Sequence, residues 1–504
     1  MLTYEVYAFD HSVRTAWLDT QRGFFNGTSL CLRVHGQEDT PHQLTLVEAG
    51  TPKDWQAATA LSHKKTTKRG FGDYLAANYD ELVDSPVELG TFWTGDFVAA
   101  GIAHRFIVSG APPSFDGVRL LADTQAICEV EITFWHGRAG KKHQPPHRHY
   151  LFMLHAAHDN YGGLEHRNST ALICKRADLP RLGQSTAGEP SDGYTTLLGL
   201  ISHEYFHTWN VKRLRPAEFS RYDYAQENYT ELLWFFEGFT SYFDDLLLRR
   251  AKLIDNTHYL KLLGKTINAV RQTPGRKVQS VAQASMDAWV KYYRQDENTA
   301  NATVSYYTKG SLVALCLDLS LRQGGKTSLD EVMRALWQRC QGGPMTESDL
   351  LSVLSDLSGQ PYADQLQQWV HGTDDLPLQK LLESHGVRYK KESALRPDQL
   401  GLRVNEHKGL HVKSVLRGGA AEQAGFAAGD EWLGVEVGQP KARQTWRLNK
   451  LDDLALYLGE ANTFNALVAR DQRLMTLHVS LAGQVKQVKL SAREESQVNA
   501  WLAP

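Results

Sequence analysis

The sequence predicts an α+β protein of several domains, in which a β-rich region precedes a helical block and a second β-rich unit follows. Within residues 1 to about 145, apolar and polar residues alternate over short runs such as 29–34 and 127–134, a pattern typical of half-buried strands. Residues 195 to about 386 instead carry apolar residues at helical spacing. The alternation returns from Leu400. A chain of 504 residues is long enough for about three such domains.

The helical block is predicted to contain several helices with readable ends. Residues Thr327 and Thr346 each open a capping-box pattern, and Gly359 fits a C-terminal stop. Long stretches without proline predict three further helices, at residues 195–211, 230–252 and 305–323.

Three predicted domains follow from these changes of pattern. They are a β-rich N-terminal domain at 1–145, a helical domain at 146–390 and a β-rich unit at 396–490. Residues 388–399 are charged and end in a proline turn, so we interpret them as a linker.

The composition excludes several classes of protein. With 55 basic and 57 acidic residues the net charge is -2, so bulk charge attracts neither nucleic acid nor an anionic membrane. No stretch reaches the roughly 18 apolar residues of a transmembrane helix, and the N-terminus shows no signal-peptide pattern. The 5 cysteines are an odd number and far apart, which favours a reducing compartment. We therefore expect a cytoplasmic protein.

The strongest motif is the pentapeptide HEYFH at residues 203–207. On a helix, positions i and i+4 lie side by side, so His203 and His207 can bind one Zn²⁺. Glu204 would face the same cavity, accept the proton of an attacking water and pass it to a leaving amine. A chance match is the alternative.

A third ligand is expected on a neighbouring helix. Glu237 lies in the aromatic run WFFEGFTSY at 234–242, and a buried carboxylate needs a partner such as a metal. A structural ion pair is the alternative. Asp244 lies two helical turns further on the same face. It is either a hydrogen-bond partner of a ligand histidine or an acid in solvent or in a surface ion pair.

Taken in this order, the motifs resemble the gluzincin peptidases, which include aminopeptidase N. The interval between His207 and Glu237 is longer than in aminopeptidase N and resembles the glycyl aminopeptidase family of PDZ-containing metallopeptidases. The resemblance covers nearly the whole chain. It implies a thermolysin-like catalytic domain with one Zn²⁺ held by His203, His207 and Glu237.

The run SYYTKG at 305–310 is similar to the Tyr-x-Lys-Gly element of the gluzincins. In that element the tyrosine hydroxyl donates a hydrogen bond to the oxyanion of the tetrahedral intermediate. The resemblance assigns this role to Tyr307, with Tyr306 as the alternative.

The run YGGLEH at 161–166 resembles the Gly-x-Met-Glu-Asn exopeptidase motif. The resemblance implies that the backbone of Gly162 and Gly163 pairs with the substrate and that Glu165 binds its free α-ammonium. His166 stands where relatives have Asn. Taken alone, GGLE is typical of a turn.

The C-terminal unit resembles a PDZ domain of the bacterial protease type, through the run GGAAEQAGFAAGDEWL at 418–433. Leu400, Gly401 and Leu402 match its carboxylate-binding loop, which would hold the C-terminus of a peptide. The alternative is that this unit only packs against the catalytic domain.

The resemblance as a whole implies a zinc aminopeptidase that removes small N-terminal residues, Gly or Ala, from peptides. Two alternatives are an endopeptidase that captures chains with its PDZ domain and an inactive, zinc-stabilised peptide-binding protein. Retention of Glu204 argues against inactivity. Relatives carry more β structure before the point where this chain opens, so the N-terminal domain is expected to be incomplete at its start.

Overall fold

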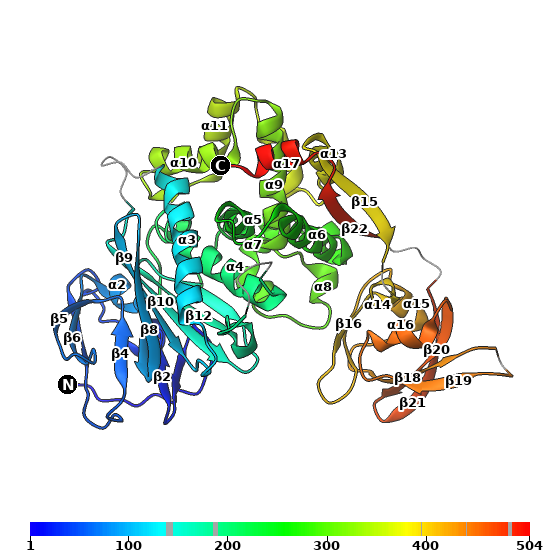
Figure 1. Cartoon of the computed structure of the whole chain (residues 1–504), viewed down its shortest axis with the longest axis horizontal. Helices are drawn as coiled ribbons and strands as arrows, with labels where there is room; N and C mark the ends of the chain where they lie inside the picture. The colour runs from blue at the N-terminus through cyan, green and yellow to red at the C-terminus, as the bar shows by residue number, and fades with distance from the viewer. Residues whose placement is uncertain (138–144, 185–189, 395, 440, 482–485) are drawn as a thin grey trace.

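The computed structural model describes residues 1–137, 145–184, 190–394, 396–439, 441–481 and 486–504. Figure 1 shows a β-rich N-terminal region beside a central helical domain, with a β-rich C-terminal unit on the other side. A β-rich N-terminal region and a helical domain are present as predicted, but one sheet includes strands from both sides of the predicted boundary at residue 145. In the part of the chain described, no helix is both long and apolar enough to cross a membrane.

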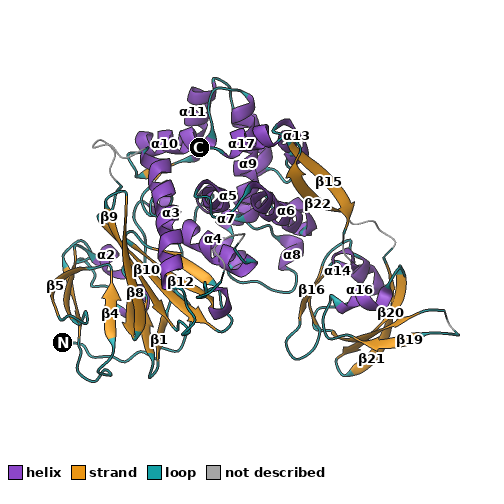
Figure 2. Cartoon of the chain, in the orientation of Figure 1, coloured by secondary structure: helices purple, strands orange, loops and turns teal. Residues whose placement is uncertain are grey.

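Two small sheets form the first part of the N-terminal region (Figure 2). One has the order β1-β2-β7-β4 and the other the order β3-β6-β5. Their strands are β1 (Ala16–Leu18), β2 (Arg22–Phe25), β3 (His42–Leu46), β4 (Gln56–Thr59), β5 (Ser62–Thr66), β6 (Gly72–Ala76) and β7 (Val87–Gly90). The short helices here are α1 (Gly27–Leu30) and α2 (Tyr79–Val83).

A five-stranded sheet with the order β11-β12-β10-β9-β8 joins this region to the helical domain. Strand β10 runs parallel to β9 and β12, whereas β8 and β11 are antiparallel to their neighbours. Strand β11 therefore lies at one edge of the sheet. The strands are β8 (Phe92–Ala99), β9 (Ile102–Ser109), β10 (His149–Ala157), β11 (Gly162–Glu165) and β12 (Ser169–Lys175).

Two runs predicted as strands are not strands. Residues 127–134 lie inside helix α3 (Gly117–His136), which buries Leu120, Thr124 and Ile127 on one face. The short alternating run is part of a longer stretch with helical spacing. A helix of 20 residues forms instead, because most of its backbone groups hydrogen-bond within it. Residues 29–34 include the end of α1, whose N-cap Asn26 accepts a hydrogen bond from the Thr28 N–H.

The helical domain contains the predicted long helices, with two short strands, β13 (Arg215–Pro216) and β14 (Pro344–Met345), between them. The helices are α4 (Asp192–Phe206), α5 (Leu233–Arg250), α6 (Asn256–Gln272), α7 (Val281–Met286), α8 (Thr299–Ala302), α9 (Thr308–Gln323), α10 (Leu329–Arg339), α11 (Glu347–Ser358), α12 (Ala363–Leu366) and α13 (Leu378–Ser384).

The predicted helix ends are only partly right. The Thr346 capping box opens α11, and Gly359 ends it in a left-handed conformation with φ of 70°. The capping box predicted at Thr327 is wrong, because α10 has Ser328 at its N-cap. The Thr327 hydroxyl instead donates a hydrogen bond to Glu331.

The predicted linker is wrong over its first half. Residues Val387–Ser393 form strand β15, which pairs along its whole length with β22 (Lys486–Ala492). The chain then ends in α17 (Glu495–Leu502), whose Val498 and Trp501 are buried in the core of the helical domain. Figure 1 shows β15 and β22 side by side, far from each other in the sequence. The charged run was interpreted as a linker because the strand that pairs with it lies near the C-terminal end of the sequence, where no local pattern reveals it.

The C-terminal unit has a sheet of the order β16-β17-β18-β20-β21, with β19 paired to β18, and its own apolar core around Trp432. Its strands are β16 (Leu402–Asn405), β17 (His411–Val415), β18 (Glu431–Val437), β19 (Gln444–Arg447), β20 (Thr463–Arg470) and β21 (Arg473–Ser480). Its helices are α14 (Arg396–Leu400), α15 (Ala420–Ala424) and α16 (Asp453–Leu458).

Candidate active site

The HEYFH pentapeptide lies at the C-terminal end of α4. The helix begins after Ser191, whose side chain accepts a hydrogen bond from the Tyr194 N–H, and it ends at His207. The ring centroids of His203 and His207 are 4.6 Å apart with planes at 87°. One helical turn therefore places two imidazoles around a common point, as the spacing predicts.

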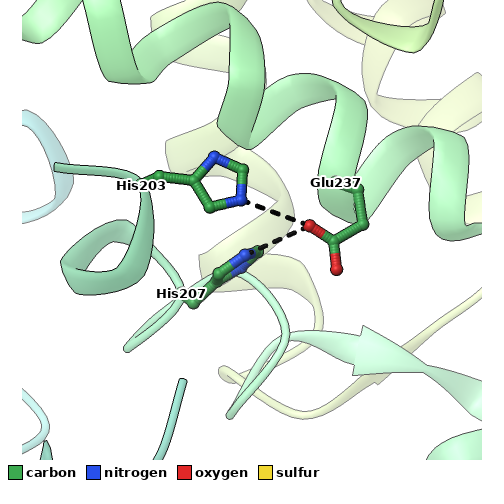
Figure 3. Close-up of side chains that lie close together, drawn as sticks. All are labelled: His203, His207 and Glu237. Atoms are coloured by element: carbon green, nitrogen blue, oxygen red, sulfur yellow. Dashed lines mark hydrogen bonds and ion pairs between the residues drawn. The ribbon is translucent and has the colours of Figure 1, made fainter. Parts of the chain in front are cut away.

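Glu237, on α5, lies opposite these two rings (Figure 3). The Nε2 atom of His203 is 3.3 Å, and that of His207 is 3.2 Å, from the same Oε2 atom of Glu237. Potential ligand atoms of the three residues all lie within 4.8 Å of one another. The three predicted ligands thus come together from two helices.

The other nitrogen of each ring fixes where its proton lies. The backbone carbonyl of Asn210 is 2.7 Å from Nδ1 of His207, and a carbonyl only accepts, so Nδ1 carries the proton. Nδ1 of His203 lies 3.0 Å from Oδ2 of Asp244. Burial alone would lower the pKa of both rings, but the carboxylates around them raise it above its usual value, so without a metal each Nε2 carries a proton toward Glu237. A neutral ring would present an Nε2 lone pair there instead.

This arrangement fits a divalent metal. One divalent cation between the rings and the carboxylate can replace these two protons, with each neutral Nε2 and the Glu237 oxygen as ligands. Two imidazoles and a carboxylate are a ligand set that catalytic Zn²⁺ uses, with the fourth position open. Of the two alternatives for Asp244, the structure shows the hydrogen bond to His203, which orients that ring. The Asn210 carbonyl has the same role for His207, and no side-chain pattern in the sequence signals it.

Two glycines explain why α5, which carries Glu237, and α9, which follows Tyr307, lie so close to each other. A Cβ on Gly238 of α5 would lie 2.6 Å from the Cα of Gly310 of α9. A Cβ on Gly310 would lie 2.6 Å from the carbonyl oxygen of Trp234. The two helices therefore cross in backbone contact. This crossing fixes Glu237, one residue before Gly238, relative to Tyr307, three residues before Gly310.

Glu204 is buried, at 5% exposure, and packs against the edge strand β11. A Cβ on Gly163 would lie only 2.0 Å from its Oε1 atom. Burial, and after it the negative charge of Glu165, raise the pKa of Glu204 to about 7. A carboxylate with such a pKa can take up a proton and release it near neutral pH.

Glu165 lies at the end of β11. Carboxylate oxygens of Glu165 and Glu204 and a ring nitrogen of His207 lie within 4.8 Å of one another. Gly162, the residue before Gly163, has open space where a Cβ would be. The predicted substrate-binding residues are thus next to the predicted base.

His166 belongs to a polar cluster with Asp84 and Lys212, and all three line the same cavity as Glu165 and Glu204. Its Nδ1 lies 3.0 Å from Oδ1 of Asp84. The same oxygen forms an ion pair with Nζ of Lys212 at 2.7 Å. Burial would raise the pKa of Asp84, but the Lys212 ammonium and the hydrogen bond of His166 hold it well below its usual range. His166, which stands where the exopeptidase motif has Asn, is therefore held by the Asp84–Lys212 ion pair beside β11.

The two tyrosines have different surroundings, although both line the same cavity. The Tyr307 ring stacks on the His203 ring with centroids 6.2 Å apart. Tyr306 is 1% exposed and packs against Tyr292 at 4.8 Å. Burial raises the pKa of Tyr307 well above its usual value, so its hydroxyl stays protonated and able to donate.

All of the predicted zinc, base, oxyanion and ammonium-binding residues line one large cavity of about 1180 Å³. Leu400, Gly401 and Leu402 are not among its lining residues. They lie in the C-terminal unit, where Leu400 is buried and Gly401 has a left-handed φ of 71°. The Gly401 carbonyl accepts a hydrogen bond of 2.8 Å from the Leu416 N–H.

Comparison with known proteins identifies relatives of this chain. Residues 196–313 match the M61 glycyl aminopeptidase family, and residues 1–91 match the peptidase M61 N-terminal domain. The crystal structure of an aminopeptidase N family protein from Idiomarina loihiensis is 35% identical, with a TM-score of 0.89 over 99% of this chain and 85% of that chain. The protein is therefore a peptidase. It belongs to the M61 glycyl aminopeptidase family.

More distant structures also match. An M1 zinc metallopeptidase from Deinococcus radiodurans is 15% identical, with a TM-score of 0.48 over 74% of this chain and 75% of that chain. A mutant of that enzyme bound to a Tyr-Ser-Ala substrate is 14% identical, with a TM-score of 0.46 over 72% and 73%. The sequence identities and TM-scores of these two structures are too low to support a conclusion about this chain. None of the curated proteins matches this chain.

Proposed function

We propose that the protein is a zinc-dependent aminopeptidase that removes small N-terminal residues, Gly or Ala, from peptides. The observation that supports this most is the convergence of two imidazoles, their carboxylate partner, a buried acid and a second acid in one cavity. The name of the family matched by residues 196–313 supports the preference for small residues.

His203, His207 and Glu237 would hold the zinc. When bound, zinc polarises the scissile carbonyl and acidifies a water molecule. Glu204 takes the proton of the attacking water and delivers it to the leaving amine, for which its pKa of about 7 is well suited. Its burial against Gly163 holds the carboxylate in one position.

Tyr307 would donate a hydrogen bond to the developing oxyanion. Its ring lies beside His203, on the wall of the same cavity. Such a preorganised donor typically contributes about 3 kcal/mol, because it is aimed at charge that appears only in the transition state.

Glu165 would bind the free α-ammonium of the substrate. It ends the edge strand β11, so a peptide that adds to this edge at Gly162 and Gly163 would bring its N-terminus to the carboxylate. An amine fixed at this point leaves room for one residue before the scissile bond, which defines an aminopeptidase.

The C-terminal unit, within the predicted range 396–490, is proposed to be a PDZ domain. Its strand β16 is the first of its sheet order, so one edge of β16 is available for a peptide strand, next to Leu400 and Gly401. Contacts of Asn301 with the Val415 carbonyl and the Arg417 N–H support the alternative, in which the unit packs on the catalytic domain.

All five cysteines are free, which agrees with a cytoplasmic location.

A panel of peptides with free and with acetylated N-termini tests this function. Cleavage of free Ala- and Gly-peptides alone is expected of the aminopeptidase. Equal cleavage of the acetylated peptides would replace it by the endopeptidase. Binding of peptides without cleavage by the zinc-loaded protein would leave the inactive binding protein.

A further inference from the structure

A second cavity, of about 560 Å³, lies in the helical domain between α6, α9, α13 and β15. Its lining residues are different from those of the active-site cavity. The apolar part of its wall includes Ile267, Val270, Leu312, Leu376 and Leu378. A volume of this size is typical of sites for small organic molecules.

Lys309 is the unusual residue of this cavity. It is only 2% exposed, and its Nζ has no hydrogen-bond partner in the part of the chain that the structure describes. The other buried basic side chains of that part are satisfied: Arg22 pairs with Glu88 at 2.7 Å, and Arg215 donates to backbone carbonyls. A buried ammonium without a partner is costly, so a partner from outside the chain would stabilise this amine.

The charges around Lys309 do not supply that partner. Asp375, the acid with the largest effect on the Lys309 amine, is shared by Arg276 and Lys277 at 3.1 Å each. In total five basic and three acidic side chains line the cavity. The wall thus keeps an excess of positive charge.

We propose that this cavity binds a small organic monocarboxylate, with its carboxylate paired to the Lys309 ammonium and its apolar group against Val270 and Leu312. A monoanion is favoured over a phosphate dianion, because the acidic side chains of the wall, Asp374, Asp375 and Glu383, repel a second negative charge. The apolar wall favours a ligand with a hydrocarbon part over a bare ion.

The state of the amine agrees with this proposal. Burial lowers the pKa of Lys309 to about 8, so the amine is still largely charged at neutral pH. A bound carboxylate would raise this pKa again. The site is separate from the zinc residues, since Tyr307 and Thr308 line the active-site cavity whereas Lys309 and Leu312 line the second one.

Calorimetric titration of the zinc-loaded full chain with hexanoate tests the proposal. We expect saturable binding, weakened by about tenfold or more in Lys309→Met, because a charged hydrogen-bond partner is lost. Lys326→Met, at an exposed lysine outside the cavity, should bind like the wild type. Hexanamide, the neutral isostere, should bind the wild type more weakly than hexanoate.

A crystal structure of the wild-type protein with hexanoate gives a second, mutation-independent reading. The carboxylate is expected beside Lys309, even if Lys309→Met fails to fold. No binding, equal binding to a folded Lys309→Met protein, or a carboxylate located only at the zinc would overturn the proposal. Binding of inorganic phosphate in place of hexanoate would overturn the assigned ligand class.

Discussion

At the scale of single residues, the most specific proposal is that Tyr307 donates a hydrogen bond to the oxyanion. Tyr307→Phe removes one hydroxyl and little volume, so kcat should fall about 10²- to 10³-fold while KM changes by no more than a few-fold. Steady-state kinetics on a free Ala-peptide measures both. Tyr306→Phe is the matched control and should keep its activity, and a reversed result would transfer the role to Tyr306.

Glu165 is expected to act on substrate choice and on pH dependence. Glu165→Gln should weaken free-amine substrates by about 2 to 4 kcal/mol in kcat/KM, because a buried charge pair is lost, whereas acetylated peptides should gain relative to them. Glu165 also raises the pKa of Glu204, whose deprotonated form is the base. Removing the charge lowers that pKa, so the acid limb of the kcat/KM profile should move to lower pH. A limb that stays in place would contradict the coupling.

At the scale of elements, the contact between β11 and α4 makes a test with an internal control. Gly163→Ala would place a Cβ 2.0 Å from the Glu204 carboxylate, whereas nothing lies within 4 Å of a Cβ at Gly162. We expect Gly163→Ala to lose about 10²-fold in kcat, since displacing the base by about 1 Å is enough for this, and Gly162→Ala to stay near wild type. Circular dichroism and zinc content should be unchanged in both. Equal effects of the two substitutions would mean that β11 does not position Glu204.

The elements also differ in how well they could be predicted from the sequence. HEYFH and Glu237 were readable because a helix fixes the geometry between residues four apart and because a lone acid in an aromatic run needs a partner. Helix α3 was missed because eight residues of it alternate by chance. Strand β15 was missed because its partner, β22, lies almost a hundred residues later. The contact of Gly163 with Glu204 depends on two elements that no local pattern relates.

At the scale of the whole molecule, the C-terminal unit can be removed without cutting the helical domain. Ser393 and Lys486 are paired neighbours on β15 and β22, so replacing residues 394–485 by Asn-Gly should turn the two strands into a hairpin. Strand β22 and helix α17, which complete the helical core, stay in place.

This excised protein tests capture of substrates by the proposed PDZ domain. Short Ala-peptides should be cleaved at the wild-type kcat/KM within about twofold, because they cannot reach from the zinc to a separate domain. Longer peptides with an apolar C-terminus should lose affinity. A folded variant that treats short and long peptides as the wild type does would favour a purely structural role for the unit.

The central claim, a zinc site whose base is Glu204, is tested most directly by zinc titration of metal-free wild-type and Glu204→Gln proteins. We expect both proteins to bind one zinc per chain, and wild-type activity to rise in proportion to the zinc bound. The Glu204→Gln protein should remain about 10²-fold or more less active at full zinc occupancy, because its acid–base group is missing. A fully zinc-loaded Glu204→Gln protein with near wild-type kcat, or wild-type activity that does not depend on zinc, would contradict the account.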